Sequence, residues 1–164
     1  MYIIEPASAD KQERIASFVK RMLTSLYPEG SYDPDPADLA AFEETYIVPP
    51  NACFFIAVNE HGDIVGTGAV RPYNERFPFL REGLAEGPTC ELVRFYIDEN
   101  YRRIGLGAAL FAKSETFAKS IGYTQGYLHT SVYLPGGYPF WLSRGYEELH
   151  WETDQVVHMR KRLS

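Results

Sequence analysis

One segment in the second half of the chain limits the fold more than any other. Residues 89–98, TCELVRFYID, are rich in β-branched and aromatic side chains and predict a buried strand. The stretch YRRIGLGAAL, residues 101–110, follows and leads into a predicted helix that ends at Gly122. GYLHTSVYL, residues 126–134, predicts the next strand. Residues 89–131 therefore form a strand–helix–strand unit, and its ligand site is expected at the carboxyl end of the first strand.

The rest of the chain adds elements on both sides of this unit. An apolar stripe from Ile15 to Leu26 predicts one helix, and Asp35-Pro36 predicts the start of another that ends before Pro49. A short helix is expected near Phe140, and the other segments read as strands: 2–7, 53–60, 63–73, 147–152 and 156–163. This order predicts an α/β fold, with a mixed, mostly antiparallel sheet flanked by helices on both faces. We expect one domain, residues 1–164.

Charge and cysteine content narrow the classes of partner. The formal net charge is −6, which argues against nucleic-acid or acidic-membrane binding because both need a basic surface. No apolar window approaches the ~18 residues of a membrane span, and the N-terminus does not resemble a signal peptide. Cys53 and Cys90 lie in apolar strand-like runs, so we expect two reduced, buried thiols, a cytoplasmic location and no metal site.

The glycine segment predicts an anion site. The first turn of a helix leaves backbone N–H groups unpaired, and a phosphate group is their natural partner. Gly105 and Gly107 let the backbone approach a ligand closely, while Arg102 and Arg103 add positive charge. The P-loop pattern is absent, and the dinucleotide fingerprint would need a glycine where Leu110 stands. The segment therefore predicts a pyrophosphate seat of another kind.

Two separate motifs resemble the GNAT family of N-acetyltransferases. The family signature is Arg/Gln-x-x-Gly-x-Gly/Ala, after a strand and opening a helix, and residues 102–107, RRIGLG, match it. ELVRFYIDENY, residues 91–101, looks like the family's central strand, and FWLSRGYEEL, residues 140–149, looks like its late FYxxxGF segment. The order of elements is similar over essentially the whole chain.

The resemblance implies acetyl-coenzyme A as the co-substrate and an acyl-CoA N-acyltransferase-like fold. In that fold the sheet splays between the strands at 89–98 and 126–134 and makes a slot for the pantetheine arm. Backbone amides of 103–108 would hold the pyrophosphate, and backbone groups of Phe95 and Ile97 would meet the pantetheine arm. The implied cofactor residues are Phe95, Ile97, Arg102, Arg103, Ile104, Gly105, Leu106, Gly107 and Ala108.

Glu91 is the candidate general base, acting through a water molecule. Strand alternation predicts that it shares a face with Val93, Phe95 and Ile97, where apolar neighbours would raise the pKa of its carboxyl group. The alternative is a structural role in which Glu91 pairs with a nearby cation such as Arg71 or Arg94. The residues alone do not separate these two roles.

The general acid departs from the family pattern. Trp141 follows Phe140 where the family has tyrosine, and an indole cannot donate a proton as an acid at neutral pH. Tyr138 lies about one helical turn earlier and is the candidate acid, with Tyr133 a weaker one. His129 is also a tempting base, but a lone histidine in a strand is more often packed or hydrogen-bonded.

Three functions compete on these grounds. The leading one is direct acetyl transfer from acetyl-coenzyme A to a primary amine of a small molecule or a protein. The second is a non-catalytic acyl-coenzyme A-binding module, motivated by Trp141, and the third is a structural α/β domain. Acidic residues between 29 and 44 would suit a cationic amine, whereas RFPFLREG, residues 76–83, would equally suit an amino acid or an aromatic carboxylate. The resemblance also implies a homodimer through the last strands.

Overall fold

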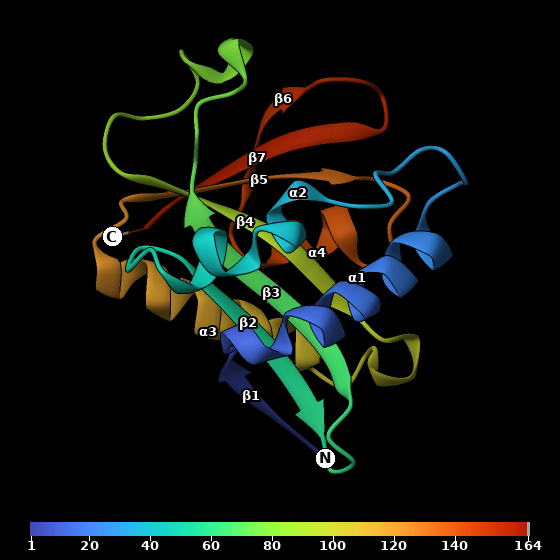
Figure 1. The fold of residues 1–164 in the computed structure, drawn as a ribbon. Helices are drawn as coiled ribbons and strands as arrows, with labels where there is room; N and C mark the ends of the chain where they lie inside the picture. Colours follow the sequence, from blue (N-terminus) through green and yellow to red (C-terminus); the bar gives the residue numbers. More distant parts are fainter. Residues whose placement is uncertain (164) are drawn as a thin grey trace. The chain divides into compact units, whose positions relative to one another are not determined.

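The computed structural model describes residues 1–163, and Ser164, the last residue of the predicted domain, lies outside the described part. The chain contains both helices and strands (Figure 1). The strands are β1 (Tyr2–Pro6), β2 (Cys53–Asn59), β3 (Ile64–Pro72), β4 (Thr89–Ile97), β5 (Gln125–Ser131), β6 (Glu147–Trp151) and β7 (Val156–Arg162). The helices are α1 (Gln12–Leu26), α2 (Ala37–Ala40), α3 (Leu106–Ile121) and α4 (Gly137–Ser143), with a π-helical turn at Glu43–Ile47.

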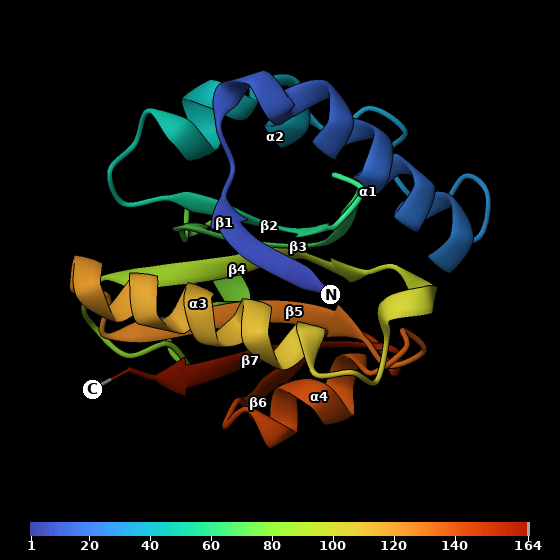
Figure 2. The same cartoon turned by 90° about the horizontal axis from the view of Figure 1, so that it is seen from below.

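The strands follow the order β1-β2-β3-β4-β5-β7-β6. β1 with β2, β2 with β3, β5 with β7 and β6 with β7 are antiparallel pairs, which confirms the predicted mixed, mostly antiparallel sheet. β4 and β5 are parallel, and within residues 1–163 their pairing covers only Thr89–Glu91 and Gln125–Tyr127. Figure 2 shows α1 and α2 on one side of β1–β3 and α3 on the other side.

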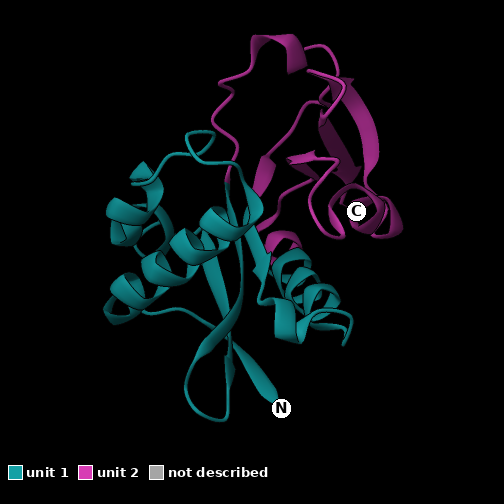
Figure 3. Cartoon of the chain, turned by 90° about the vertical axis from the view of Figure 1, so that its right-hand side faces the viewer, with its two compact units in different colours: residues 1–71, 93–117 teal, residues 72–92, 118–164 magenta. Residues whose placement is uncertain are grey.

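Contacts divide the chain into two compact units, coloured in Figure 3. Unit 1 comprises Met1–Arg71 and Val93–Phe117. Unit 2 comprises Pro72–Leu92 and the chain from Ala118 onward. β4 and α3 each begin in one unit and end in the other, and the two units are described separately below.

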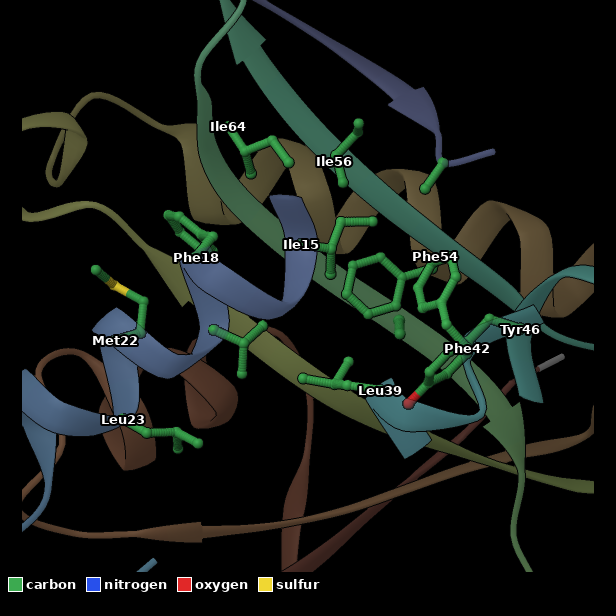
Figure 4. Close-up of a cluster of buried hydrophobic side chains, with 13 residues drawn as sticks. Ile15, Phe18, Met22, Leu23, Leu39, Phe42, Tyr46, Phe54, Ile56 and Ile64 are labelled. Atoms are coloured by element: carbon green, nitrogen blue, oxygen red, sulfur yellow. The ribbon is translucent and has the colours of Figure 1, made fainter. Parts of the chain in front are cut away.

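The predicted stripe of α1 forms the main core of unit 1 (Figure 4). Ile15, Phe18 and Met22 are buried together with Phe54 and Ile56 of β2. A second core on the other side of β2 and β3 contains Leu106 and Leu110 of α3. Apolar side chains at helical spacing on α1 and α3 thus cover both faces of the same strands.

The second predicted helix is broken in the structure. α2 ends after four residues because Ala41 takes φ −105° and ψ 47°, outside the helical region. The apolar residues beyond the break are still buried: the rings of Phe42 and Tyr46 lie 5.2 and 5.0 Å from that of Phe54. The contacts that these two rings make with Phe54 therefore do not require a continuous helix.

Unit 2 is built on β5 and β7, whose central residues are buried. β5 stops at Ser131, earlier than the predicted end at residue 134, because the N–H of Leu134 turns back to the Ser131 carbonyl at 3.2 Å. Both cysteines are free thiols, with Cys90 buried and Cys53 only half-buried. Among residues 1–163, no helix has the length and apolar character needed to cross a membrane.

Candidate functional site

The turn between β4 and α3 is anchored within unit 1. The backbone N–H of Asp98 donates to the Val65 carbonyl of β3 at 2.9 Å. The Asp98 carboxylate accepts hydrogen bonds from the Asn100 backbone N–H at 2.9 Å and from Arg21 Nη1 at 3.1 Å. Backbone and side chain of one residue thus fix the start of the predicted anion-binding loop.

The loop itself alternates in backbone handedness. Arg103 has φ +64° and Gly105 has φ +87°, whereas Ile104 between them is not left-handed. Such alternation turns successive N–H groups toward one side and makes a concavity that suits anions. A Cβ atom at Gly105 would meet no heavy atom within 4 Å, so the space beside this residue is open.

The first turn of α3 continues the same surface. Its hydrogen-bond ladder begins with the Ala109 N–H donating to the Gly105 carbonyl at 3.0 Å. The N–H groups of Leu106, Gly107 and Ala108 precede that bond and have no carbonyl acceptor in the ladder. They form the positive end of a helix of 16 residues. These donors and the left-handed loop fit a diphosphate group.

Two glycines of β3 make room for the side chains around this loop. A Cβ at Gly68 would come within 2.7 Å of Phe95, and one at Gly66 within 3.0 Å of Leu110. Phe95 and Ile97 pack on the α3 side of the strands as a result. Arg102 folds back and donates through Nε to the Ile97 carbonyl at 3.2 Å. All nine predicted cofactor residues thus lie within unit 1, at the end of β4 and the start of α3.

β4 is not a regular strand, which corrects one prediction. Arg94 has φ +59°, a left-handed conformation in the middle of the strand. As a result Val93 packs against the α1 core, whereas Phe95 and Ile97 pack against the α3 core. The prediction that Glu91 shares one face with all three residues is therefore wrong, because simple alternation ends at Arg94.

The Arg94 side chain is held by a partly buried ion pair in unit 1. Its Nε and Nη2 donate to the two carboxylate oxygens of Asp38 at 3.0 and 2.7 Å. The Tyr46 hydroxyl donates to the same carboxylate at 2.7 Å. Burial alone would raise the pKa of Asp38, but the hydrogen bonds and charge of Arg94 outweigh burial and lower it. Asp38 therefore does not belong to a solvated acidic surface.

Glu91 lies in unit 2 and is bound by a cation other than the two predicted partners. Its side chain is 1% exposed, and both carboxylate oxygens accept from Arg76, at 2.8 and 2.6 Å. The guanidinium of Arg76 also lies 4.5 Å from the centre of the Phe77 ring. The predicted partners were Arg71 or Arg94, and Arg94 is paired with Asp38 instead. Glu91 is thus buried as one half of a bidentate ion pair.

A cluster of rings lies next to Glu91 in unit 2. His129 of β5 and His158 of β7 are directly opposite each other in the antiparallel register. His158 is fully buried and Tyr127 stacks on it with an interplanar angle of 13°. Burial lowers the pKa of both His129 and His158, while carboxylates nearby oppose the shift. In residues 1–163, no three His, Cys, Asp or Glu side chains are placed to hold a metal ion.

Tyr138 and Trp141 occupy different surroundings on α4. The Tyr138 hydroxyl donates to the Glu148 carboxylate, which also accepts from Trp151 Nε1 at 2.6 Å. The hydrogen bond to Glu148 raises the pKa of Tyr138. Trp141 is buried, with its ring 5.7 Å from that of Tyr146. The residue that replaces the family tyrosine therefore serves the core of unit 2.

The long loop after β3 encloses a pocket of about 370 Å³ in unit 2. Tyr73, Phe77 and Leu80 give it apolar walls, and Glu75 and Arg81 add charges of opposite sign. Rings with a few charged groups are typical of pockets for small polar molecules. This pocket makes the loop a candidate wall for the acceptor.

Arg76, Tyr127 and His158 are residues of the candidate site that sequence reasoning missed. Arg76 belongs to an irregular loop, so its approach to Glu91 leaves no periodic signal. Tyr127 and His158 meet only through the register of β5 and β7. A register assignment that placed His129 opposite His158 would have revealed the cluster.

Comparisons with known proteins agree on one family. The Acetyltransferase (GNAT) family matches residues 17–146. N-acetylaspartate synthetase of Homo sapiens is 30% identical over 112 residues, which cover 68% of this chain and 33% of that protein. N-acetyltransferase 8 of Homo sapiens is 25% identical over 111 residues, covering 68% of this chain and 45% of that protein. The chain thus spans less than half the length of these curated relatives.

Solved structures share the fold. A GNAT acetyltransferase from Staphylococcus aureus has a TM-score of 0.80 at 18% identity, with each chain covered in full. The PaiA N-acetyltransferase of Thermoplasma acidophilum, solved in complex with coenzyme A, has a TM-score of 0.68 at 14% identity, with 99% of each chain covered.

Proposed function

Since this chain belongs to the Acetyltransferase (GNAT) family, we propose that it transfers the acetyl group of acetyl-coenzyme A directly to a primary amine. The observation that carries the proposal is the left-handed loop at Arg103–Gly105 beneath the free first turn of α3. Such a surface favours a diphosphate, and coenzyme A contains one. The proposal treats residues 1–164 as one catalytic domain in the cytoplasm.

In this proposal the cofactor is held largely by backbone groups. N–H groups of residues 103–108 bind the pyrophosphate, with the exposed Arg103 side chain as a nearby positive charge. Backbone groups of Phe95 and Ile97 bind the pantetheine arm, although the Ile97 carbonyl already accepts from Arg102. Bound acetyl-coenzyme A supplies an activated thioester carbonyl for direct attack by the amine.

Tyr138 and Glu91 are proposed to assist the chemistry from unit 2. Tyr138 protonates the leaving thiolate, for which its hydroxyl must exchange the hydrogen bond to Glu148 for one to sulfur. For Glu91, the bidentate pair with Arg76 favours the role of a fixed buried charge over that of a base acting through water. Replacing Tyr138 with phenylalanine should lower kcat and leave acetyl-coenzyme A binding unchanged.

We propose a free amino acid as the first acceptor to test. By its name, a relative 30% identical to this chain makes N-acetylaspartate. The pocket of the loop after β3 offers Arg81 for a carboxylate and Glu75 for an ammonium group. The acidic segment between residues 29 and 44 is a weaker lead, because Asp38 is committed to Arg94. Two further proposals rest on the sequence alone. One is a protein amine as the acceptor, and the other is a homodimer formed through the last strands.

Calorimetric titration with acetyl-coenzyme A tests the cofactor seat, with NAD as the control ligand. We expect binding of acetyl-coenzyme A alone, and its loss in Gly107→Val with the circular dichroism spectrum unchanged, because the added side chain lies beside the first-turn amides. The matched control is Ala112→Val, a similar enlargement at an exposed position of the same helix. Unchanged affinity in Gly107→Val would refute the proposed seat.

Thiol release measured with L-aspartate, lysine and a polyamine then tests transfer. We expect release that depends on one of these amines. Cofactor binding without any amine-dependent thiol release would instead support the non-catalytic binding module. That alternative was suggested by Trp141 in place of a tyrosine, and the burial of Trp141 in the core offers another reason for a tryptophan at this position.

A further inference from the structure

Hydrogen bonds in unit 2 connect an exposed carboxylate to a half-exposed imidazole. Glu152, whose side chain is 46% exposed, lies 2.7 Å from His158 Nε2. His158 Nδ1 lies 2.6 Å from the Tyr127 hydroxyl oxygen, which in turn is 3.4 Å from His129 Nδ1. The His129 side chain is 41% exposed. The chain of contacts therefore begins at the exposed Glu152, passes through the buried His158 and ends at the accessible His129.

The carboxylate fixes the direction of every bond in this chain. An ionised Glu152 can only accept, so His158 Nε2 must carry the proton. Burial lowers the pKa of His158 and keeps the ring neutral, so its Nδ1 accepts the proton of the Tyr127 hydroxyl. The Tyr127 oxygen is then left as an acceptor, and His129 satisfies it with Nδ1–H. His129 Nε2 consequently carries a free lone pair.

We propose that His129 Nε2 is the base that takes a proton from the acceptor amine, and that Glu152, His158 and Tyr127 hold His129 in the required tautomer. This inference rests on the proposed acetyl transfer. The amine nitrogen bonds to the carbonyl carbon, the carbon–sulfur bond breaks, and its electron pair leaves with sulfur. Two protons leave the ammonium group: His129 accepts one and releases it to solvent, and the other restores the Tyr138 hydroxyl after Tyr138 has protonated sulfur.

The surroundings of His129 suit this role. His129 lies two residues beyond Tyr127, the last β5 residue paired with β4. Within residues 1–163 its Nε2 has no hydrogen-bond partner. The Phe77 ring packs 5.9 Å from it, and burial among such rings lowers the pKa of His129, so the base is neutral at neutral pH.

Charged groups face His129 from several segments and set the stability of its protonated form. The Glu91 carboxylate of β4 lies 4.0 Å from His129 Nδ1 and favours the imidazolium, as does Glu152. His158 of β7 and Arg76 of the loop oppose it. Glu91 therefore has a part in this scheme as a carboxylate that is paired with Arg76 and lies beside His129.

The tautomer is the first test, because it does not require enzymatic activity. Two-bond proton–nitrogen NMR correlations on labelled protein identify the protonated nitrogen of each histidine. We expect Nδ1–H for His129 and Nε2–H for His158. In Tyr127→Phe, which keeps the stacked ring but removes the hydroxyl, His129 should lose its preference for Nδ1–H, while the exposed His61 stays unchanged. An Nε2–H form of His129 in the wild type would overturn the inference.

Kinetics with an amine that supports thiol release give the second test. His129→Gln should lower kcat by about 10²–10⁴-fold, the usual contribution of a general base, with acetyl-coenzyme A affinity unchanged. Glu152→Gln should move the acid limb of the pH–rate profile to lower pH, because it removes a charge that favours the imidazolium. Glu147→Gln, an exposed residue of β6, is the matched control and should leave the limb in place.

The outcomes separate the inference from the proposed function. Wild-type kcat in His129→Gln would overturn the assignment of the base while leaving acetyl transfer intact. If no amine supports thiol release, the proposed function fails, whereas the tautomer measurement still decides whether the chain of hydrogen bonds orients His129.

Discussion

Arg94 interrupts β4 with a left-handed backbone and forms a bidentate ion pair with Asp38. A left-handed conformation of a residue other than glycine costs about 1–3 kcal/mol and persists only where its surroundings hold it. The Thr67 hydroxyl holds the backbone by donating to the Arg94 carbonyl at 2.6 Å, and Asp38 holds the side chain. The shape of β4 therefore depends on a residue of α2 that is distant in sequence.

Asp38→Asn should destabilise the protein by about 3–5 kcal/mol at pH 7, because it leaves the mostly buried Arg94 without its counter-charge. Chemical denaturation measures this difference directly. Asp154→Asn, in the exposed turn between β6 and β7, is the control and should change stability by less than about 0.5 kcal/mol. An equal effect of both substitutions would refute the role given to the ion pair.

The same substitution has a pH signature. The pKa of Asp38 is lowered in the folded protein, so its contribution is complete above the unfolded value of about 4 and is lost as the pH falls through the folded pKa. The difference between wild type and Asp38→Asn should therefore shrink below about pH 4. A difference that stays constant down to pH 3 would contradict this assignment.

At the level of single residues, the sequence predicts features that arise from residues close together in the chain. It does not predict contacts that only the fold brings about. The spacing of Arg102, Gly105 and Gly107 at a helix start predicts an anion seat, and the left-handed backbone at Arg103 and Gly105 is compatible with one. The pair of Arg76 with Glu91 depends on the path of an irregular loop, so no spacing could indicate it. The positive φ of Arg94 was equally hidden, since the residue type gives no sign of it.

Gln125 connects one element to another in unit 2. Its buried amide accepts from the Ala85 N–H at 3.0 Å and donates to the Ala85 carbonyl at 3.1 Å. It also donates to the Thr89 hydroxyl at 3.0 Å. A single side chain of β5 thus holds the far end of the loop that forms the candidate acceptor pocket.

Gln125→Ala should therefore loosen that loop more than it unfolds the protein. We expect a loss of about 1–3 kcal/mol, because the backbone groups of Ala85 lose their partner. Hydrogen exchange should quicken at residues 83–86 and stay unchanged in unit 1. Gln155→Ala, an exposed glutamine before β7, is the control. Unaltered exchange at residues 83–86 would show that the loop is held by other contacts.

Elements with a regular pattern of apolar residues were predicted well. Elements whose ends depend on tertiary contacts or tight turns were not. The stripe of α1 and the hairpin of β2 and β3 formed as expected, because local pattern and tertiary burial agree there. The second predicted helix is interrupted at Ala41, although its apolar residues are buried. A helical spacing of buried apolar residues therefore does not require a continuous helix. β5 ended early because a tight turn at Leu134 competes with further pairing.

For the whole molecule, binding of acetyl-coenzyme A should appear as added stability. A ligand that binds only the folded state at about 100 times its Kd contributes roughly 2.7 kcal/mol, or a rise in Tm of about 5–10 °C for a chain of this size. Thermal unfolding with acetyl-coenzyme A, compared with NAD, measures the shift. The rise should vanish in Gly107→Val and persist in Ala112→Val. Equal shifts with both nucleotides would point to nonspecific binding.

The division of the chain between two units has a consequence for its synthesis on the ribosome. Unit 1 needs Val93–Phe117 as well as its first 71 residues, and unit 2 needs segments on both sides of that stretch. Neither unit is encoded by one uninterrupted run of codons. Residues 72–92 are translated before β5 and β7, the strands they belong with. Unit 1 has all its residues first, and the loop with Arg76 and Glu91 stays without its partner strands, exposed to chaperones, until β7 has emerged.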